Sequence, residues 1–251
     1  MDTNTNIFIF IMVGFIAQTI DGALGMAYGV SSNTFLLGIG VPPAAASASV
    51  HMAEVVTTAI SGVSHWRLGN LDSKLIKSLL LPGMLGAVAG AYILTNIPGD
   101  ILKPFISAYL LIMGVVILVK GLSKTHIEQK VVSHLSILGV IGGFFDAVGG
   151  GGWGPIVTTT LVARGNNPRL TIGSVNFSEF FVTFAQSVVF VFSLQFADYW
   201  KIILGLLIGG AIAAPLAAIV TKKLPVHKLM LLVGTLIILL SIRTLYLALI
   251  G

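Results

Sequence analysis

Residues 146–155 read Asp-Ala-Val-Gly-Gly-Gly-Gly-Trp-Gly-Pro and place an acidic residue, four consecutive glycines and a proline inside an apolar region. Gly destabilises a helix interior by about 1 kcal/mol relative to Ala, and Pro by about 3 kcal/mol. The apolar flanks, 131–145 and 156–163, are each too short to cross a bilayer of about 30 Å at about 1.5 Å per residue. We therefore expect two short helices that meet at an irregular turn within a membrane.

The composition indicates an integral membrane protein. Of the 251 residues, 56% are hydrophobic and 9% are charged, whereas about a quarter of the residues of a soluble protein are charged. Continuous apolar runs such as 104–119 and 229–240 predict helices rather than the alternating strands of a membrane barrel. Nucleic acid is not an expected partner, although the net charge is +5, because the basic residues lie between apolar runs and not in a patch.

The opening of the chain repeats this pattern. The apolar run 7–20 stops at Asp21, and 26–40 follows it. An ungapped shift of 125 residues pairs Asp21 with Asp146 and gives fourteen identities in the fifty positions from residue 14 to 63. Leu, Gly and Ala matches arise by chance in an apolar chain, but a coincident Asp, Pro and Glu do not. The sequence therefore predicts an internal duplication.

Each half is expected to contain a broken helical hairpin followed by three transmembrane helices. The polar stretch 123–133 is the predicted linker, and it is expected to be cytoplasmic. The predicted elements are a hairpin at 7–40 and helices at 44–64, 75–95 and 103–119 in the first repeat (1–122), and a hairpin at 131–165 and helices at 170–194, 202–221 and 229–250 in the second repeat (134–251).

The basic residues predict the topology. If each broken segment crosses the membrane once, the Lys and Arg residues divide almost evenly and no orientation follows. If each is a hairpin, one side holds eleven of the fourteen, and the two halves become inverted repeats with both termini outside. The other side holds only Lys103, Lys201 and Arg243. The eleven are Arg67, Lys74, Lys77, Lys120, Lys124, Lys130, Arg164, Arg169, Lys222, Lys223 and Lys228.

The chain resembles the sulfite exporter TauE/SafE family of membrane transporters. The resemblance lies in the two breaks, 21–29 and 146–155, and in the stretches 43–54 and 168–179 that follow them. It covers essentially the whole chain. It implies the passage of small sulfur-containing anions, such as sulfite or organosulfonates, across a bacterial-type cytoplasmic membrane.

The glycine run predicts a backbone binding site for an anion. Oriented N–H groups at the start of a half helix bind anions without a cationic side chain, whereas the simpler interpretation is close helix packing through small residues. No Lys or Arg is expected near the breaks. Replacing Gly150 or Gly151 with Val is expected to abolish transport and leave a folded protein. The candidate substrate-binding residues are Gly22, Gly25, Asn33, His51, Gly149, Gly150, Gly151, Gly152, Trp153 and Asn176.

Four carboxylates inside the membrane are candidate coupling residues: Asp21, Glu54, Asp146 and Glu179. The simpler interpretation is that the two Asp residues cap the half helices and that the two Glu residues hydrogen-bond to the broken backbone. His51 precedes Glu54 by three residues and so shares its helix face. Any proton coupling is therefore expected mainly on His51 and Glu54.

These observations predict a secondary transporter, and not an enzyme, that moves a small sulfur-containing anion, with export as the expected direction. A cation or metal-ion carrier that uses the carboxylates is the alternative. A membrane-embedded enzyme is less favoured because the sequence has no Ser/His/Asp set, metal-ligand cluster or nucleotide loop. The expected partners are the anion and the lipid bilayer, and a homodimer is left open. No cofactor or metal site is expected, and the expected location is the inner membrane of a prokaryote.

Overall fold

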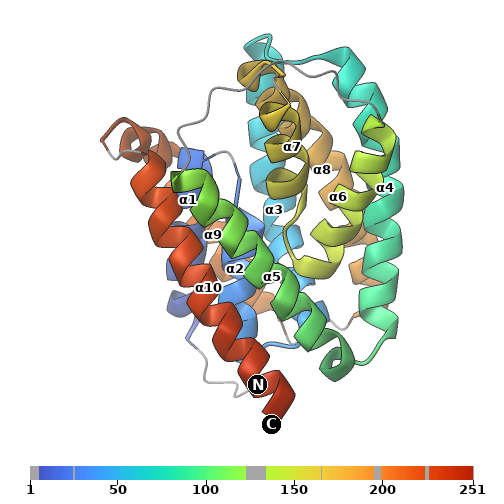
Figure 1. Cartoon of the computed structure of the whole chain (residues 1–251), viewed down its shortest axis with the longest axis vertical. Helices are drawn as coiled ribbons and strands as arrows, with labels where there is room; N and C mark the ends of the chain where they lie inside the picture. The colour runs from blue at the N-terminus through green and yellow to red at the C-terminus, as the bar shows by residue number, and fades with distance from the viewer. Residues whose placement is uncertain are drawn as a thin grey trace.

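The chain folds into a bundle of helices (Figure 1). The computed structural model describes residues 6–24, 26–122, 134–164, 166–194, 199–223 and 226–250, and these ranges contain no strand. The prediction of an all-α protein is confirmed. The helices are α1 (Ile7–Leu24), α2 (Tyr28–Gly38), α3 (Pro43–Arg67), α4 (Ser73–Asn96), α5 (Gly99–Leu122), α6 (Leu135–Gly149), the π-helix η1 (Trp153–Thr158), α7 (Thr159–Ala163), α8 (Pro168–Ser193), α9 (Trp200–Lys223) and α10 (Val226–Ile250).

Local chemistry explains several of the helix boundaries. Pro43 and Pro168 stand at the first positions of α3 and α8, where the missing proline N–H costs no hydrogen bond. Asp72 and Asn167 cap α4 and α8 by accepting hydrogen bonds from backbone N–H groups in the first turn. The helices after each break begin one to four residues before their predicted starts, and α8 ends one residue before its predicted end. The predicted linker, 123–133, lies outside the described residues.

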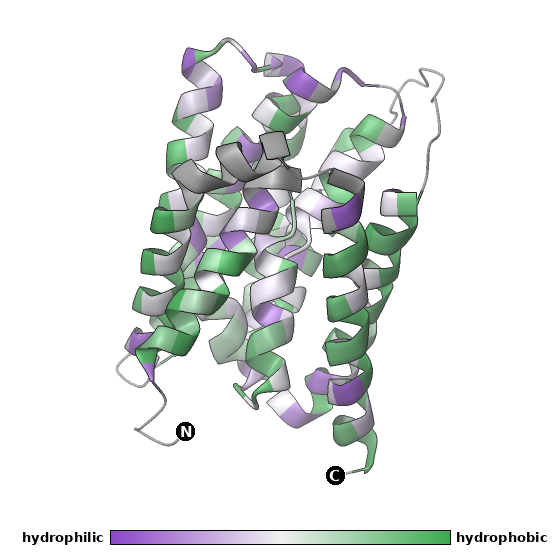
Figure 2. Ribbon diagram, turned by 90° about the vertical axis from the view of Figure 1, so that its left-hand side faces the viewer, coloured by the Kyte–Doolittle hydropathy of each residue, from purple (hydrophilic) through white to green (hydrophobic). Residues whose placement is uncertain are grey.

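Four of the described helices, α4, α5, α8 and α10, are long and apolar enough to cross a membrane. The helix α3 is as long but less apolar, because it carries polar side chains that are buried inside the protein. Large hydrophobic side chains lie instead on the outside of the bundle: Phe105 is 70% exposed and Leu239 is 61% exposed. Figure 2 shows this hydrophobic exterior along the helix that ends at the C-terminus. An exterior of this kind fits a multi-pass membrane protein.

The two halves of the chain pack against each other in reciprocal pairs. The helix α1 lies against α9, and α6 lies against α4; α3 contacts α8, and α5 contacts α10. Glycines allow the closest of these approaches. A Cβ atom at Gly209 would overlap the carbonyl oxygen of Ile11 in α1, and one at Gly86 would overlap that of Val140 in α6.

The segments around the two breaks are joined to neighbouring helices at different ends of the bundle. In Figure 1, α5 ends and α6 begins toward the upper end, whereas α10 ends at the lower end. At the upper end the Arg169 Nη2 atom donates to the Leu68 carbonyl, 3.1 Å away, and joins the start of α8 to the turn after α3. At the lower end the Arg243 Nη1 atom donates to the Gly38 carbonyl, 2.6 Å away, and joins α10 to the end of α2. The residues that follow the two breaks, Tyr28 and Trp153, are buried inside the protein.

Candidate functional site between the two helix breaks

The second break is an irregular turn that only glycine accommodates. After α6 ends at Gly149, Gly150 has φ = +68° and Gly151 has φ = +153°, conformations that are strained for residues with a Cβ atom. The chain then re-enters a helix as η1, with Pro155 in its first turn. Proline has no N–H to donate, so the start of a helix is the position where it costs least.

The Asp146 carboxylate holds this turn in place. Its Oδ1 atom accepts hydrogen bonds from the backbone N–H groups of Gly152, at 2.8 Å, and Trp153, at 2.9 Å. Its Oδ2 atom accepts one from the Gln186 amide in α8, at 2.7 Å. The amide N–H groups that the sequence suggested for an anion are therefore already bound to a carboxylate of the protein itself.

His51 lies between two carboxylates. Its Nε2 atom is 3.2 Å from Asp146 Oδ2 and 3.7 Å from Glu54 Oε2. Its Nδ1 atom is 2.8 Å from the Ser47 carbonyl oxygen, which only accepts hydrogen bonds, so Nδ1 carries a proton. A neutral ring would then turn the Nε2 lone pair toward the carboxylates. A second proton, on Nε2 or on one of the two carboxyl groups, is required to make these contacts favourable.

The contacts of His51 differ from those expected from the sequence. Glu54 was the expected partner because it lies one helical turn away. In the structure the closer carboxylate is Asp146, which comes from the other half of the chain. Ser47 supports the same arrangement, because its hydroxyl donates to the Ala147 carbonyl at 2.5 Å and lies 3.2 Å from His51 Nδ1.

The first break is built from equivalent residues but has fewer contacts. Asp21 Oδ1 accepts a hydrogen bond from the Tyr28 N–H at 3.3 Å, as Asp146 does from Trp153. Ala27 precedes α2 with φ = 99°. Gly22 lies in the last turns of α1, and Gly25 lies outside the described residues.

The two breaks touch each other. The Asn33 side chain in α2 donates to the Gly149 carbonyl at 2.6 Å, and the Tyr109 hydroxyl in α5 donates to the Gly151 carbonyl at 3.1 Å. A Cβ atom at Gly29 would lie 2.7 Å from the Gly151 Cα atom. A valine at Gly150 or Gly151 would force the breaks apart, so the expectation that these variants stay folded is not supported.

A small cavity lies at this junction. Its volume of about 20 Å³ is enough for about one water molecule. Four carboxylates line it, together with backbone and apolar groups from both breaks. The lining residues are Asp21, Met26, Ala27, Tyr28, Gly29, Val30, Glu54, Asp146, Gly151, Gly152, Gly154, Pro155 and Glu179.

Several other candidate residues do not line this cavity. The Trp153 indole is fully buried, and its Nε1 atom donates to the Val175 carbonyl at 3.1 Å. The Asn176 amide donates to the Ile172 carbonyl at 2.9 Å.

Sequence reasoning missed Gln186, although its position seven residues after Glu179 places both on one face of α8. Tyr109 had no such signal, because it approaches the site from a helix outside both hairpins.

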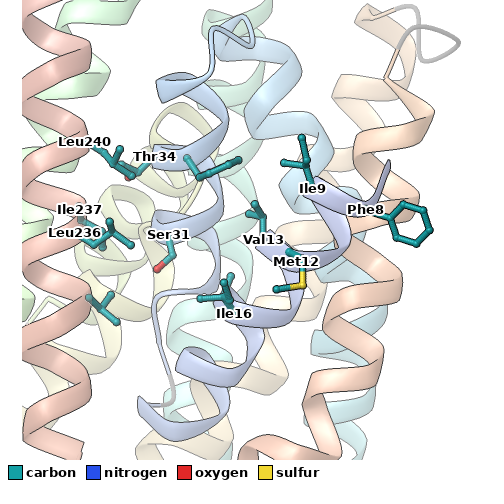
Figure 3. Close-up of a pocket in the computed structure, with 13 residues that line it drawn as sticks. Phe8, Ile9, Met12, Val13, Ile16, Ser31, Thr34, Leu236, Ile237 and Leu240 are labelled. Atoms are coloured by element: carbon teal, nitrogen blue, oxygen red, sulfur yellow. The ribbon is translucent and has the colours of Figure 1, made fainter. Parts of the chain in front are cut away.

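A larger cavity lies elsewhere in the described part of the bundle. It has a volume of about 520 Å³ and opens between α1, α2 and α10. Figure 3 shows its hydrophobic lining, with Met12, Ile16 and Leu236 among the side chains. Its two hydroxyl groups are those of Ser31 and Thr34, and Thr34 already donates to the Val30 carbonyl. Because these walls offer almost nothing to a charged solute, the smaller cavity between the breaks is the candidate site.

Comparisons with known proteins agree with the resemblance noted above. The family model for sulfite exporter TauE/SafE matches residues 10–244. The chain is 46% identical over 246 residues to the "Probable membrane transporter protein YtnM" of Bacillus subtilis (strain 168), and the match covers 94% of this chain and 82% of the relative. No solved structure matches it. The chain belongs to the sulfite exporter TauE/SafE family of membrane transporters.

Proposed function

We propose that the protein carries a small sulfur-containing anion, of the sulfite or organosulfonate type, across the cytoplasmic membrane of a prokaryote. The observation that carries this proposal is the meeting of two glycine-rich breaks, one from each half, at a single cavity in the middle of the bundle. Binding sites at paired helix breaks near the membrane midplane are typical of secondary transporters with inverted repeats.

The reciprocal packing of the halves supports two inverted repeats. The basic residues support the same plan, since eleven of fourteen fall on one side if both breaks are hairpins. Both termini would then lie outside and the 123–133 linker in the cytoplasm. The chain has no cysteine, so single cysteines introduced at Thr3 and at Ser123 can be labelled selectively. Labelling of Thr3→Cys from the cytoplasm would contradict this topology.

Protonation of the carboxylates would make room for an anion. A neutral carboxyl accepts hydrogen bonds more weakly than a carboxylate. Transfer of a proton from His51 Nε2 to Asp146 would therefore loosen the bonds from Gly152 and Trp153. The Gly152 N–H, at the cavity wall, would then be available to an anion at the start of a half helix, where the helix dipole favours an anion.

The breaks must also separate, because a cavity of about 20 Å³ is too small for sulfite. Alternating access would achieve this if one hairpin rocks against the other and opens the site to each side in turn. Export is the expected direction. A membrane potential that is negative inside drives an anion outward with about 2.3 kcal/mol per charge per 100 mV.

The test is a flux assay with the purified protein in liposomes. Sulfite, thiosulfate, an alkyl sulfonate and sulfate are compared at fixed membrane potential, with empty liposomes as the control. We expect a saturable flux of sulfite or the sulfonate. This flux should increase when the side of the membrane that contains the anion is made electrically negative. Equal flux with protein-free liposomes would contradict the proposal.

A cation carrier is the second candidate, because four carboxylates and no basic residue line the cavity. Among the described residues, no group of three or more His, Asp or Glu side chains is placed to hold a metal ion. The same liposomes separate the two functions. Flux of a divalent cation that sulfite and sulfonates leave unchanged, without flux of the anions, would favour the cation carrier.

A further inference from the structure

Lys120 is a half-buried cation beside the candidate site. It lies two residues before the end of α5, and its Nζ atom is 3.2 Å from the Thr159 hydroxyl and 3.8 Å from the Met26 sulfur. Both partners are neutral. Among the described residues, no carboxylate oxygen lies within 4.0 Å of this ammonium group.

The two partners of Lys120 connect it to both hairpins. Met26 belongs to the first break and lines the cavity. Thr159 is the first residue of α7, in the second hairpin, and its hydroxyl also lies 3.6 Å from the Met26 sulfur. The ammonium group therefore stands where the hairpins meet, at the end of the bundle from which the 123–133 linker leaves.

No feature of the sequence predicts a basic residue here. Lys120 lies between the predicted helix 103–119 and the predicted linker 123–133, and no Lys or Arg is expected near the breaks. That expectation was wrong because α5 continues to Leu122 and crosses the bundle obliquely (Figure 1). Its last turn is thereby brought over the first break.

We propose that Lys120 and Thr159 form an entry site that captures the anion on the linker side, before it passes Met26 into the cavity. This inference rests on the proposed function. A half-buried ammonium with only neutral partners gains a charge-assisted hydrogen bond when an anion arrives. The carboxylates beyond Met26 repel anions, and a cation at the mouth counteracts that repulsion by raising the local concentration of the anion.

At the other end of the site, the counterpart residues have other partners. The repeat counterpart of Thr159 is Thr34, and its hydroxyl donates to the Val30 carbonyl of its own helix. Arg243 lies on α10, the counterpart of α5, but it donates to the Gly38 carbonyl at the far end of α2. The capture site is therefore one-sided, and it favours loading from the linker side.

The test measures sulfite flux from the linker side of reconstituted protein as a function of concentration. Removing one charge-assisted hydrogen bond costs about 1.5–3 kcal/mol, so we expect Lys120→Gln to raise the half-saturating concentration about tenfold or more. The maximal rate should change little, and Lys120→Arg should stay within about threefold of wild type. Lys103→Gln, at the other end of the same helix, is the matched control and should leave the flux unchanged.

A chemical rescue separates charge from packing. In a Lys120→Cys protein, alkylation with 2-bromoethylamine restores an ammonium group through a thioether that sulfite does not cleave, whereas iodoacetamide adds a neutral group. We expect only the first reagent to restore the low half-saturating concentration. Equal results with both reagents, or a normal Lys120→Gln protein, would overturn the entry site while the wild-type flux still supports the proposed function. Absence of anion flux in the wild-type protein would overturn both.

Discussion

The two helix breaks have matching sequences but are anchored differently. At the second break, Asp146 accepts two backbone N–H groups and the Gln186 amide, and His51 lies 3.2 Å away. At the first break, the described contact of Asp21 is a single N–H group at 3.3 Å. The second break is therefore held from three helices, and the first has fewer described contacts.

The difference comes from two substitutions between the repeats. The counterpart of Gln186 is Ser61, whose short side chain bonds to Asn176 instead of reaching a carboxylate. The counterpart of His51 is that same Asn176, which has no titratable group. A duplicated backbone motif therefore acquires different properties through the side chains that neighbouring helices direct at it.

The largest effect is expected for Asp146→Asn. Loss of the negative charge weakens three charge-assisted hydrogen bonds in a buried place, so we expect a loss of about 3 kcal/mol in the free energy of unfolding. Asp21→Asn should cost less than about 1 kcal/mol, because one long hydrogen bond is affected. Denaturation in detergent, followed by circular dichroism, measures both. Equal losses would show that the two breaks are anchored alike.

Two substitutions at equivalent positions of the repeats, Gly152→Ala and Ala27→Gly, should change the free energy of unfolding in opposite directions. A Cβ atom at Gly152 would lie 2.5 Å from the Tyr109 hydroxyl oxygen and 2.8 Å from the Asp146 nitrogen, so Gly152→Ala should destabilise the protein by about 2 kcal/mol. Ala27, its counterpart, has φ = 99°, so Ala27→Gly should stabilise it by about 0.5–1 kcal/mol. The same denaturation assay checks the signs. A destabilised Ala27→Gly protein would contradict the strain at the first break.

The pH dependence of transport should differ between Glu54→Gln and Glu179→Gln. Glu54 Oε2 lies 3.7 Å from His51 Nε2, and a glutamine imitates a permanently protonated carboxyl. We expect Glu54→Gln to flatten the pH profile of flux and Glu179→Gln to lower the rate about tenfold at every pH. Flux measured from pH 5 to pH 8 in the liposome assay gives the two profiles. Unchanged profiles in both, or a changed shape only in Glu179→Gln, would refute the assignment.

The smallest effects concern two tyrosine hydroxyls, one at each break. Tyr109 donates to the Gly151 carbonyl, which lies outside any helix, so Tyr109→Phe should cost about 1–2 kcal/mol by leaving that carbonyl unpaired. Tyr28 donates to the Leu206 carbonyl in the interior of α9, which keeps its helical partner, and Tyr28→Phe should cost about 0.5 kcal/mol. Thermal melts of the two variants under the same conditions measure both losses of stability. A larger loss from Tyr28→Phe would reverse the ranking of the breaks.

The sequence by itself determined the class of the protein and the places where its helices break. Apolar runs too long for a soluble protein, prolines at helix starts and a run of four glycines depend on local chemistry, which a sequence displays directly. The duplication was equally visible, because equivalent residues keep their spacing. The family followed from these same motifs and is confirmed by the comparisons.

Only the tertiary structure decided which groups face each other at the breaks. His51 lies closer to Asp146 than to Glu54 because α3 of the first half passes the second break, and sequence spacing predicts only neighbours on the same helix. Lys120 reaches Met26 and Thr159 because of the length and tilt of α5. Contacts of this kind join residues from 39 to 95 positions apart, and the packing of whole helices sets them.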